Sequence, residues 1–119
     1  MKKECNHEQE HLQKAESAKA YLARQNITEA AHIFHLLSDE GRLKIVLTLM
    51  QGDMCVYHLT EVCGGSQSGI SHQLRALREG KIVKAKRVGK TVEYSLADEH
   101  IRRIVEVCLA HTACEEENQ

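Results

Sequence analysis

The stretch Ser66-Gln-Ser-Gly-Ile-Ser-His-Gln-Leu-Arg-Ala-Leu77 decides the fold class of this chain. The apolar residues that recur there at the spacing of one helical face are Ile70, Leu74 and Leu77. They predict a helix anchored to a core, with polar side chains on its outer face. We expect this helix to be capped by Ser66, to run over Gln67–Glu79 and to end at Gly80.

A shorter helix is expected immediately upstream, over Val56–Val62, where Gly64 and Gly65 then break the chain. Two helices joined by a glycine-containing turn, the second with a polar outer face, are typical of a helix-turn-helix. The sequence therefore predicts a DNA-binding element over these residues.

Two more helices are predicted before this element. Thr28 is a plausible cap for a helix over Glu29–Leu37, and Ser38 or Asp39 can cap another over Glu40–Gln51. In the second of these, the residues expected to face the core are Leu43, Val46, Leu47 and Met50.

Downstream of the helix-turn-helix, the pattern changes to two short strand-like runs. Ile82–Arg87 and Thr91–Leu96 flank Val88-Gly89-Lys90, which predicts a hairpin, or wing. Asp98 or Glu99 then opens a helix to about Ala113. The order of elements predicts a mainly α chain with a small β-hairpin: a winged helix-turn-helix with extra N- and C-terminal helices.

We expect three parts along the chain. Residues 1–25 form an N-terminal arm and helix, residues 26–114 form the winged-helix DNA-binding and dimerisation domain, and residues 115–119 form an acidic tail.

The charge distribution favours DNA as a partner although the formal net charge is −1. The segment from Arg75 to Lys90 contains seven basic residues and one acidic residue, Glu79. Such an excess of positive charge is typical of a nucleic-acid surface. The alternative is an ordinary solvated basic hairpin. The candidate DNA contacts are Gln67, Ser68, Ser71, His72, Gln73, Arg75, Arg78, Lys84, Lys86, Arg87 and Lys90.

Three segments carry a family resemblance. These are Cys55-Val-Tyr-His58-Leu, the stretch Ser66–Leu77, and Lys90-Thr-Val-Glu-Tyr-Ser-Leu-Ala-Asp98-Glu-His100. Together they resemble the ArsR/SmtB family of metal-sensing repressors, over about Glu29 to Cys114. The resemblance implies a homodimer on a palindromic double-stranded operator that loses DNA affinity when its inducer binds.

The C-terminal helix carries the first candidate metal site. Asp98 and His100 stand near its start, and His111 and Cys114 share a face near its end. The two pairs are roughly 16 Å apart along one helix, too far for one ion, so two antiparallel helices of a dimer are needed to bring them together. In the family an acidic residue follows the His by three positions, so the fourth ligand here is Cys114 by register or Glu115 by chemistry. The alternative is that Asp98 is a helix cap and both histidines are solvated.

The second candidate site combines Cys55 and His58, one helical turn apart, with Cys5, His7 and His11 of the N-terminal arm. The resemblance implies that the arm comes from the opposite subunit. The expected ion at both sites is Zn(II), with Cd(II) or Pb(II) as alternatives because thiolates favour softer ions. A surface His58 and a disordered arm are the opposing interpretation. For His72 the resemblance implies a hydrogen-bonded link toward His111, and a phosphate contact is the alternative.

The five cysteines are an odd number, which argues against a disulfide framework. Cys63 and Cys108 are expected to be buried as small apolar side chains. A chain without an apolar leader or membrane-length segment is expected in the cytoplasm, with no membrane partner and no small-molecule substrate. A related repressor sensing redox state through Cys55, Cys63 or Cys114, or lacking a metal inducer, is the alternative function.

The sequence His7-Glu-Gln-Glu-His11 formally matches the zinc-protease motif. That chemistry needs a third ligand, an open coordination position and a substrate groove. A polar segment at this place in so short a chain does not provide them, so we expect no enzyme.

Overall fold

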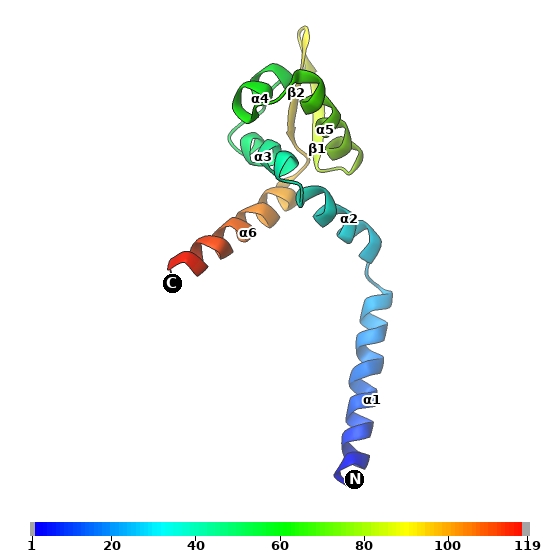
Figure 1. Cartoon of the computed structure of the whole chain (residues 1–119). Coiled ribbons are helices and arrows are strands. Elements are labelled where there is room, and N and C mark those ends of the chain that lie inside the picture. The colour runs from blue at the N-terminus through cyan, green and yellow to red at the C-terminus, as the bar shows by residue number, and fades with distance from the viewer. Residues whose placement is uncertain (1, 118–119) are drawn as a thin grey trace. The chain divides into compact units, whose positions relative to one another are not determined.

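The computed structural model describes residues 2–117, with side chains over residues 8–114. The elements follow in the order α1 (Lys2–Ala23), α2 (Ile27–Leu37), α3 (Glu40–Leu49), α4 (Val56–Cys63), α5 (Gln67–Glu79), β1 (Val83–Val88), β2 (Thr91–Leu96) and α6 (Glu99–Glu117) (Figure 1). This order confirms the predicted winged helix-turn-helix with an extra helix at each end. The chain divides into two compact units, Met1–Ala31 and His32–Gln119.

The first unit is helical, and its side chains from Glu8 to Ala31 are all exposed. The prediction that Thr28 caps the second helix is wrong, because α2 already begins at Ile27. The Asn26 carbonyl accepts the Ala30 N–H at 3.1 Å, and the Asn26 side-chain amide bonds to the Glu29 carboxylate. Asparagine followed three residues later by glutamate makes a better helix start than threonine does.

The core of the second unit is aliphatic and gathers around α3. Ile45, Val46 and Leu49 of α3 are almost fully buried, whereas the predicted core residues Leu43, Leu47 and Met50 are only half-buried. The predicted face is nevertheless confirmed, because Val46 belongs to it and the other three residues pack against the core; the buried surface extends beyond it to Ile45 and Leu49. The reason is that α3 contacts α4, α5 and β2 at once, so it buries a wider face than a helix lying on one layer. Asp39 is its cap, as one of the two predicted alternatives, and accepts the Arg42 N–H at 2.9 Å.

Helix α5 has the bounds predicted for it, and its Ile70, Leu74 and Leu77 are buried. Gly80 is the C-terminal cap of α5, as predicted, and its N–H donates to the Ala76 carbonyl at 3.0 Å. Its φ is −81°, and the residue with a left-handed φ, 64°, is Lys81. Gly80 is also needed for close packing, because a Cβ built there would stand 2.2 Å from Leu36 Cδ1.

The wing is an antiparallel pair in which Val83 faces Leu96 and Val88 faces Thr91. The two-residue loop starts at Gly89 with φ 63°, as the primed hairpin turns require. Met54, in the α3–α4 connection, forms an isolated bridge to Tyr94, with N–H···O distances of 3.1 and 2.8 Å. The wing is thus fixed to the body at its middle while its turn projects beyond the helices (Figure 1).

The last helix extends to Glu117, past the predicted end near Ala113. Ile101 and Val105 bury its first turns against the core. Within the part of the chain that the structure describes, no helix is sufficiently long and apolar to cross a bilayer.

Candidate functional site

The turn between α4 and α5 orients the helix that the sequence assigns to DNA. Gly64 and Gly65 have φ values of 85° and 84°, in the region that favours glycine. Ser66 Oγ then accepts the Gly69 N–H at 3.0 Å and starts α5. These residues turn the chain back sharply, so that α4 and α5 pack together as a helix-turn-helix.

Most of the predicted DNA contacts are exposed. On α5 the exposed members are Gln67, Ser68, Ser71, His72, Arg75 and Arg78, and on the wing they are Lys84, Lys86, Arg87 and Lys90. A cleft of about 530 Å³ separates α5 from β2, and Arg75 and Arg78 line it together with Tyr94. Tyr94 stands between two strand neighbours in the sequence, and nothing in that pattern signals the cleft.

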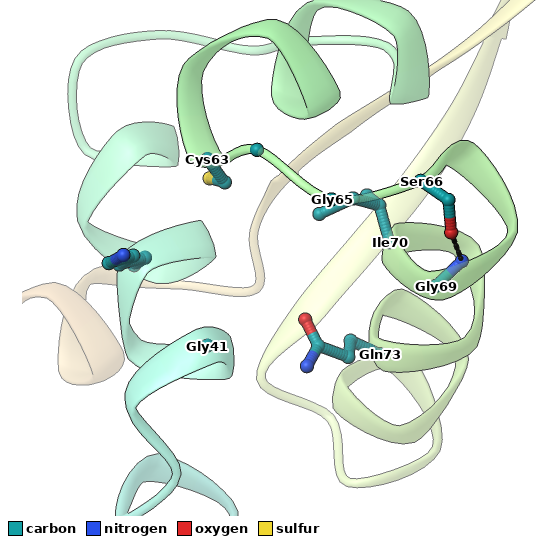
Figure 2. Close-up of a pocket in the computed structure, with 9 residues that line it drawn as sticks. Gly41, Cys63, Gly65, Ser66, Gly69, Ile70 and Gln73 are labelled. Carbon is teal, nitrogen blue, oxygen red and sulfur yellow. Dashed lines mark hydrogen bonds between the residues drawn. The ribbon is translucent and has the colours of Figure 1, made fainter.

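Gln73 is the exception among these residues. Its side chain is half-buried and points toward α3, into a cleft of about 250 Å³ that Gly41 and Ser66 also line (Figure 2). A Cβ built on Gly41 would lie 2.8 Å from Gln73 Nε2, so the missing side chain at Gly41 makes room for the amide. This placement argues against the predicted DNA contact at Gln73.

His72 is exposed on α5. Within the described residues no hydrogen bond or ion pair of its imidazole is present, so the single chain holds neither the expected link toward His111 nor a substitute for it. The role of His72 stays a prediction.

The first candidate metal half-site, by which we mean a pair of adjacent side chains able to ligate a metal, is Asp98 with His100. Asp98 Oδ1 accepts the Ile101 N–H at 3.1 Å, and Oδ2 lies 3.6 Å from His100 Nδ1. The pKa of Asp98 is lowered from 3.8 chiefly by that backbone hydrogen bond and then by the His100 imidazole. The two interpretations left open by the sequence, cap and ligand, are therefore compatible, since each uses a different oxygen.

The second half-site is Cys55 with His58. Cys55 Sγ lies 3.4 Å from His58 Nδ1, and Cys55 occupies the cap position of α4, where its thiol makes no hydrogen bond to the helix backbone. The Tyr57 ring meets the His58 ring edge-on, with centroids 5.6 Å apart. The thiol is half-buried and free, and the imidazole is exposed, so both remain accessible to an ion.

The other predicted ligands are not assembled with these pairs. His111 and Cys114 are exposed near the end of α6, and His11 is exposed on α1. The side chains of Cys5, His7 and Glu115 lie outside the described residues. Over residues 8–114, no group of three or more His, Cys, Asp or Glu side chains is placed to hold one metal ion. The donor types fit Zn(II) or a softer ion, but each half-site needs further ligands.

An apolar groove runs between α2 and α6 in the second unit. It has a volume of about 630 Å³, and its apolar lining includes Phe34, Leu37, Leu43, Ile104, Val107 and Leu109. Phe34 is 62% exposed and Val107 is 68% exposed. A surface of this kind marks an interaction site.

The expectation that Cys108 is buried is wrong for the single chain, because this thiol lies exposed in the groove between α2 and α6. Cys63 is half-buried, packs against the core and lies 3.6 Å from Thr48 Oγ1.

Comparison with known proteins agrees with this architecture. The family model described as "Bacterial regulatory protein, arsR family" matches residues 39–85. A cadmium resistance transcriptional regulatory protein CadC homolog of Staphylococcus aureus is 39% identical over 102 residues, which cover 85% of this chain and 84% of that protein. The chain belongs to the ArsR family.

This ArsR-family chain is also 41% identical over 76 residues to a transcriptional repressor SmtB homolog of Synechocystis, covering 64% of this chain and 58% of that one. In structure it resembles a homodimeric winged helix-turn-helix DNA-binding domain of Mycobacterium bovis. That match has a TM-score of 0.74, 27% identity, and coverage of 85% of this chain and 90% of the other. The family consists of DNA-binding regulators, so the enzyme interpretation of His7–His11 is rejected.

Proposed function

We propose that this ArsR-family chain is a metal-responsive transcriptional repressor. As a metal-free homodimer it binds a palindromic operator, and it releases the operator when Zn(II) or a similar thiophilic ion such as Cd(II) binds. The observation that carries the proposal is that one chain holds both an exposed basic winged helix and two preformed pairs of metal-ligating side chains. The CadC and SmtB homologs, named for cadmium resistance and repression, support it.

DNA binding is assigned to the exposed residues of α5 and the wing. In this proposal Ser71 and Arg75 reach base edges in the major groove, where arginine forks onto guanine. Lys84, Lys86 and Lys90 contact phosphates and make the affinity salt-dependent. Gln73 is left out of this set. Because bacterial DNA lies in the cytoplasm, we place the protein there.

Dimerisation is assigned to the groove between α2 and α6. Its exposed Phe34, Val107 and Leu109 are the apolar surface that a second copy would bury. We keep residues 26–114 as the DNA-binding and dimerisation domain, residues 1–25 as an arm and residues 115–119 as an acidic tail.

The dimer explains why each chain carries only pairs of ligands. Asp98 and His100 of one copy would be completed by His111 and Cys114 or Glu115 of the other, and Cys55 and His58 by Cys5, His7 or His11 of an arm. Bound Zn(II) would supply a positive charge that these side chains could share and that would fix them relative to one another. The ligand side chains would hold α6 and its partner in one arrangement, and this arrangement would change the separation or freedom of the two α5 helices.

The decisive experiment is fluorescence anisotropy of a labelled duplex that the protein itself selects from random sequences. We expect tight binding without metal, release on Zn(II) addition and recovery with EDTA. His100→Ala is the matched variant: it should keep the metal-free affinity within about threefold and lose the release by Zn(II). Binding of wild type that is indifferent to Zn(II), Cd(II) and Pb(II) would reject metal sensing and favour the cysteine-based alternative.

A further inference from the structure

A side chain at the start of α6 is bonded to the end of α3. Arg102 Nη1 donates to the Met50 backbone carbonyl at 3.2 Å, across 52 residues of sequence. Met50 is the C-terminal cap of α3, where carbonyl groups lack partners within the helix and a positive charge is favoured. Arg102 Nε lies 3.7 Å from Glu99 Oε1, one turn back on α6. The guanidinium is thus held from both sides.

The two ends of this contact lead to the two half-sites. Arg102 shares the first turns of α6 with Asp98 and His100, whose side chains lie 3.6 Å apart. After Met50 the chain runs through Met54, which is bridged to the wing, directly into Cys55 at the start of α4. The Arg102–Met50 hydrogen bond therefore adds a side-chain link, beside the Met54–Tyr94 bridge, between the backbone that carries one pair of ligands and the segment that carries the other.

The Arg102–Met50 hydrogen bond lies beside an open cleft and is partly shielded from solvent. A cleft of about 340 Å³ lies beside the start of α6, lined by Asp53, Lys84, Asp98 and Arg102 among others. The first turn of α6 is therefore not packed solidly against α3 and the wing on that side. Arg102 is two-thirds buried, with 33% of its side chain exposed, while its partner Glu99 is 78% exposed. The contact with Met50 is the better shielded of the two.

We infer that Arg102 is a positioning residue that couples the Asp98–His100 half-site to the α3–α4 segment and so to the helix-turn-helix. This inference rests on the proposed function for its physiological role. When the first turn of α6 is fixed through its ligands, Arg102 is fixed with it, and the bond to Met50 carries that constraint toward Cys55 and α4. The coupling is reciprocal, as any linkage between sites must be.

The coupling can be tested without metal by a double-mutant cycle read by amide hydrogen exchange. The reporters are the N–H groups of Gln51 and Gly52, bonded to Thr48 and Leu49, and of Met54, bonded to Tyr94. Asp98→Ala removes the cap and loosens the start of α6. We expect it to speed exchange at these reporters about tenfold with Arg102 in place, but less than about twofold in the Arg102→Met background. Equal acceleration in both backgrounds would overturn the inference.

The second test uses Zn(II) and the selected operator duplex. Arg102→Met keeps the aliphatic stem and loses the donor. It should keep metal-free operator affinity and Zn(II) affinity within about threefold, while the loss of operator affinity caused by Zn(II) shrinks at least about tenfold. Arg102→Lys, which can still donate one hydrogen bond, should restore part of the loss of operator affinity that Zn(II) causes. Glu99→Gln is the matched control, because it removes only the exposed ion pair, and it should behave as wild type.

Three outcomes separate the claims. An Arg102→Met variant that still releases the operator fully on Zn(II) addition contradicts the inference. So does a variant whose operator affinity without metal falls as much as its Zn(II) response does, because Arg102 would then be merely structural. Absence of any Zn(II) response in wild type contradicts the proposed function instead. In that case the exchange cycle alone still decides whether Arg102 couples α6 to the α3–α4 segment.

Discussion

Asp98 gives one carboxylate oxygen to helix capping and turns the other toward His100, so two substitutions can separate its roles. Asp98→Asn keeps an oxygen for the Ile101 N–H, because asparagine caps helices about as well as aspartate does. Asp98→Ala removes the cap and should destabilise the folded chain. For a chain of this size that lowers the melting temperature by about 4 °C, whereas Asp98→Asn should change it by less than about 1 °C.

Both variants should lose Zn(II) affinity at the C-terminal site. Changes one shell away from a metal already cost about 10- to 100-fold, so loss of a direct carboxylate ligand should cost at least about 100-fold. Thermal unfolding followed by circular dichroism measures the first effect, and competition with a chelating dye measures the second. An Asp98→Asn variant that binds Zn(II) as tightly as wild type would show that Asp98 is a cap and nothing more.

Four further results are expected. Since the pKa of Asp98 is below 3.8 in the folded chain, its stabilising effect is complete above that pH and is lost as pH falls through the lower folded value; NMR titration of the carboxyl should give a midpoint under 3.8. Arg75→Ala should weaken metal-free operator binding by about 1–3 kcal/mol in anisotropy, and an unchanged affinity removes it from the contacts. Val107→Asp should shift sedimentation toward monomer, unless the α2–α6 groove is no interface. Gly80→Ala should destabilise the chain by about 1–3 kcal/mol in urea unfolding, because the new Cβ meets Leu36; Leu36→Val in the same chain should recover part of the loss, and no recovery would reject the clash.

Local signals allowed the sequence to predict most of the fold. Ser66 and the apolar spacing after it gave the bounds of α5, and Gly89 gave the wing, because capping and turn chemistry act within a few residues. Where two possible helix starts lay close together, the sequence pattern indicated the wrong one. Asn26 with Glu29 starts α2 ahead of Thr28.

Features that depend on distant residues were out of reach. Gln73 turns inward because Gly41, on another helix, leaves room for it. Arg102 finds the Met50 carbonyl across 52 residues, and no periodicity or motif encodes that bond. Cys108 was assigned to the core because it continues the stripe of Ile101 and Val105, but its thiol is exposed in the groove between α2 and α6.

The close approach at Gly41 has a consequence for how such a protein can change during evolution or engineering. A side chain there would leave too little space for the Gln73 amide, which is the flexible end of a long side chain and can swing out at small cost. A methyl group on α3 would thus add an amide to the outer surface of α5 without altering α5 itself. Under the proposed function, the side chains that α5 presents to DNA therefore depend partly on a residue of α3. Gly41 is a position at which a substitution would shift operator preference.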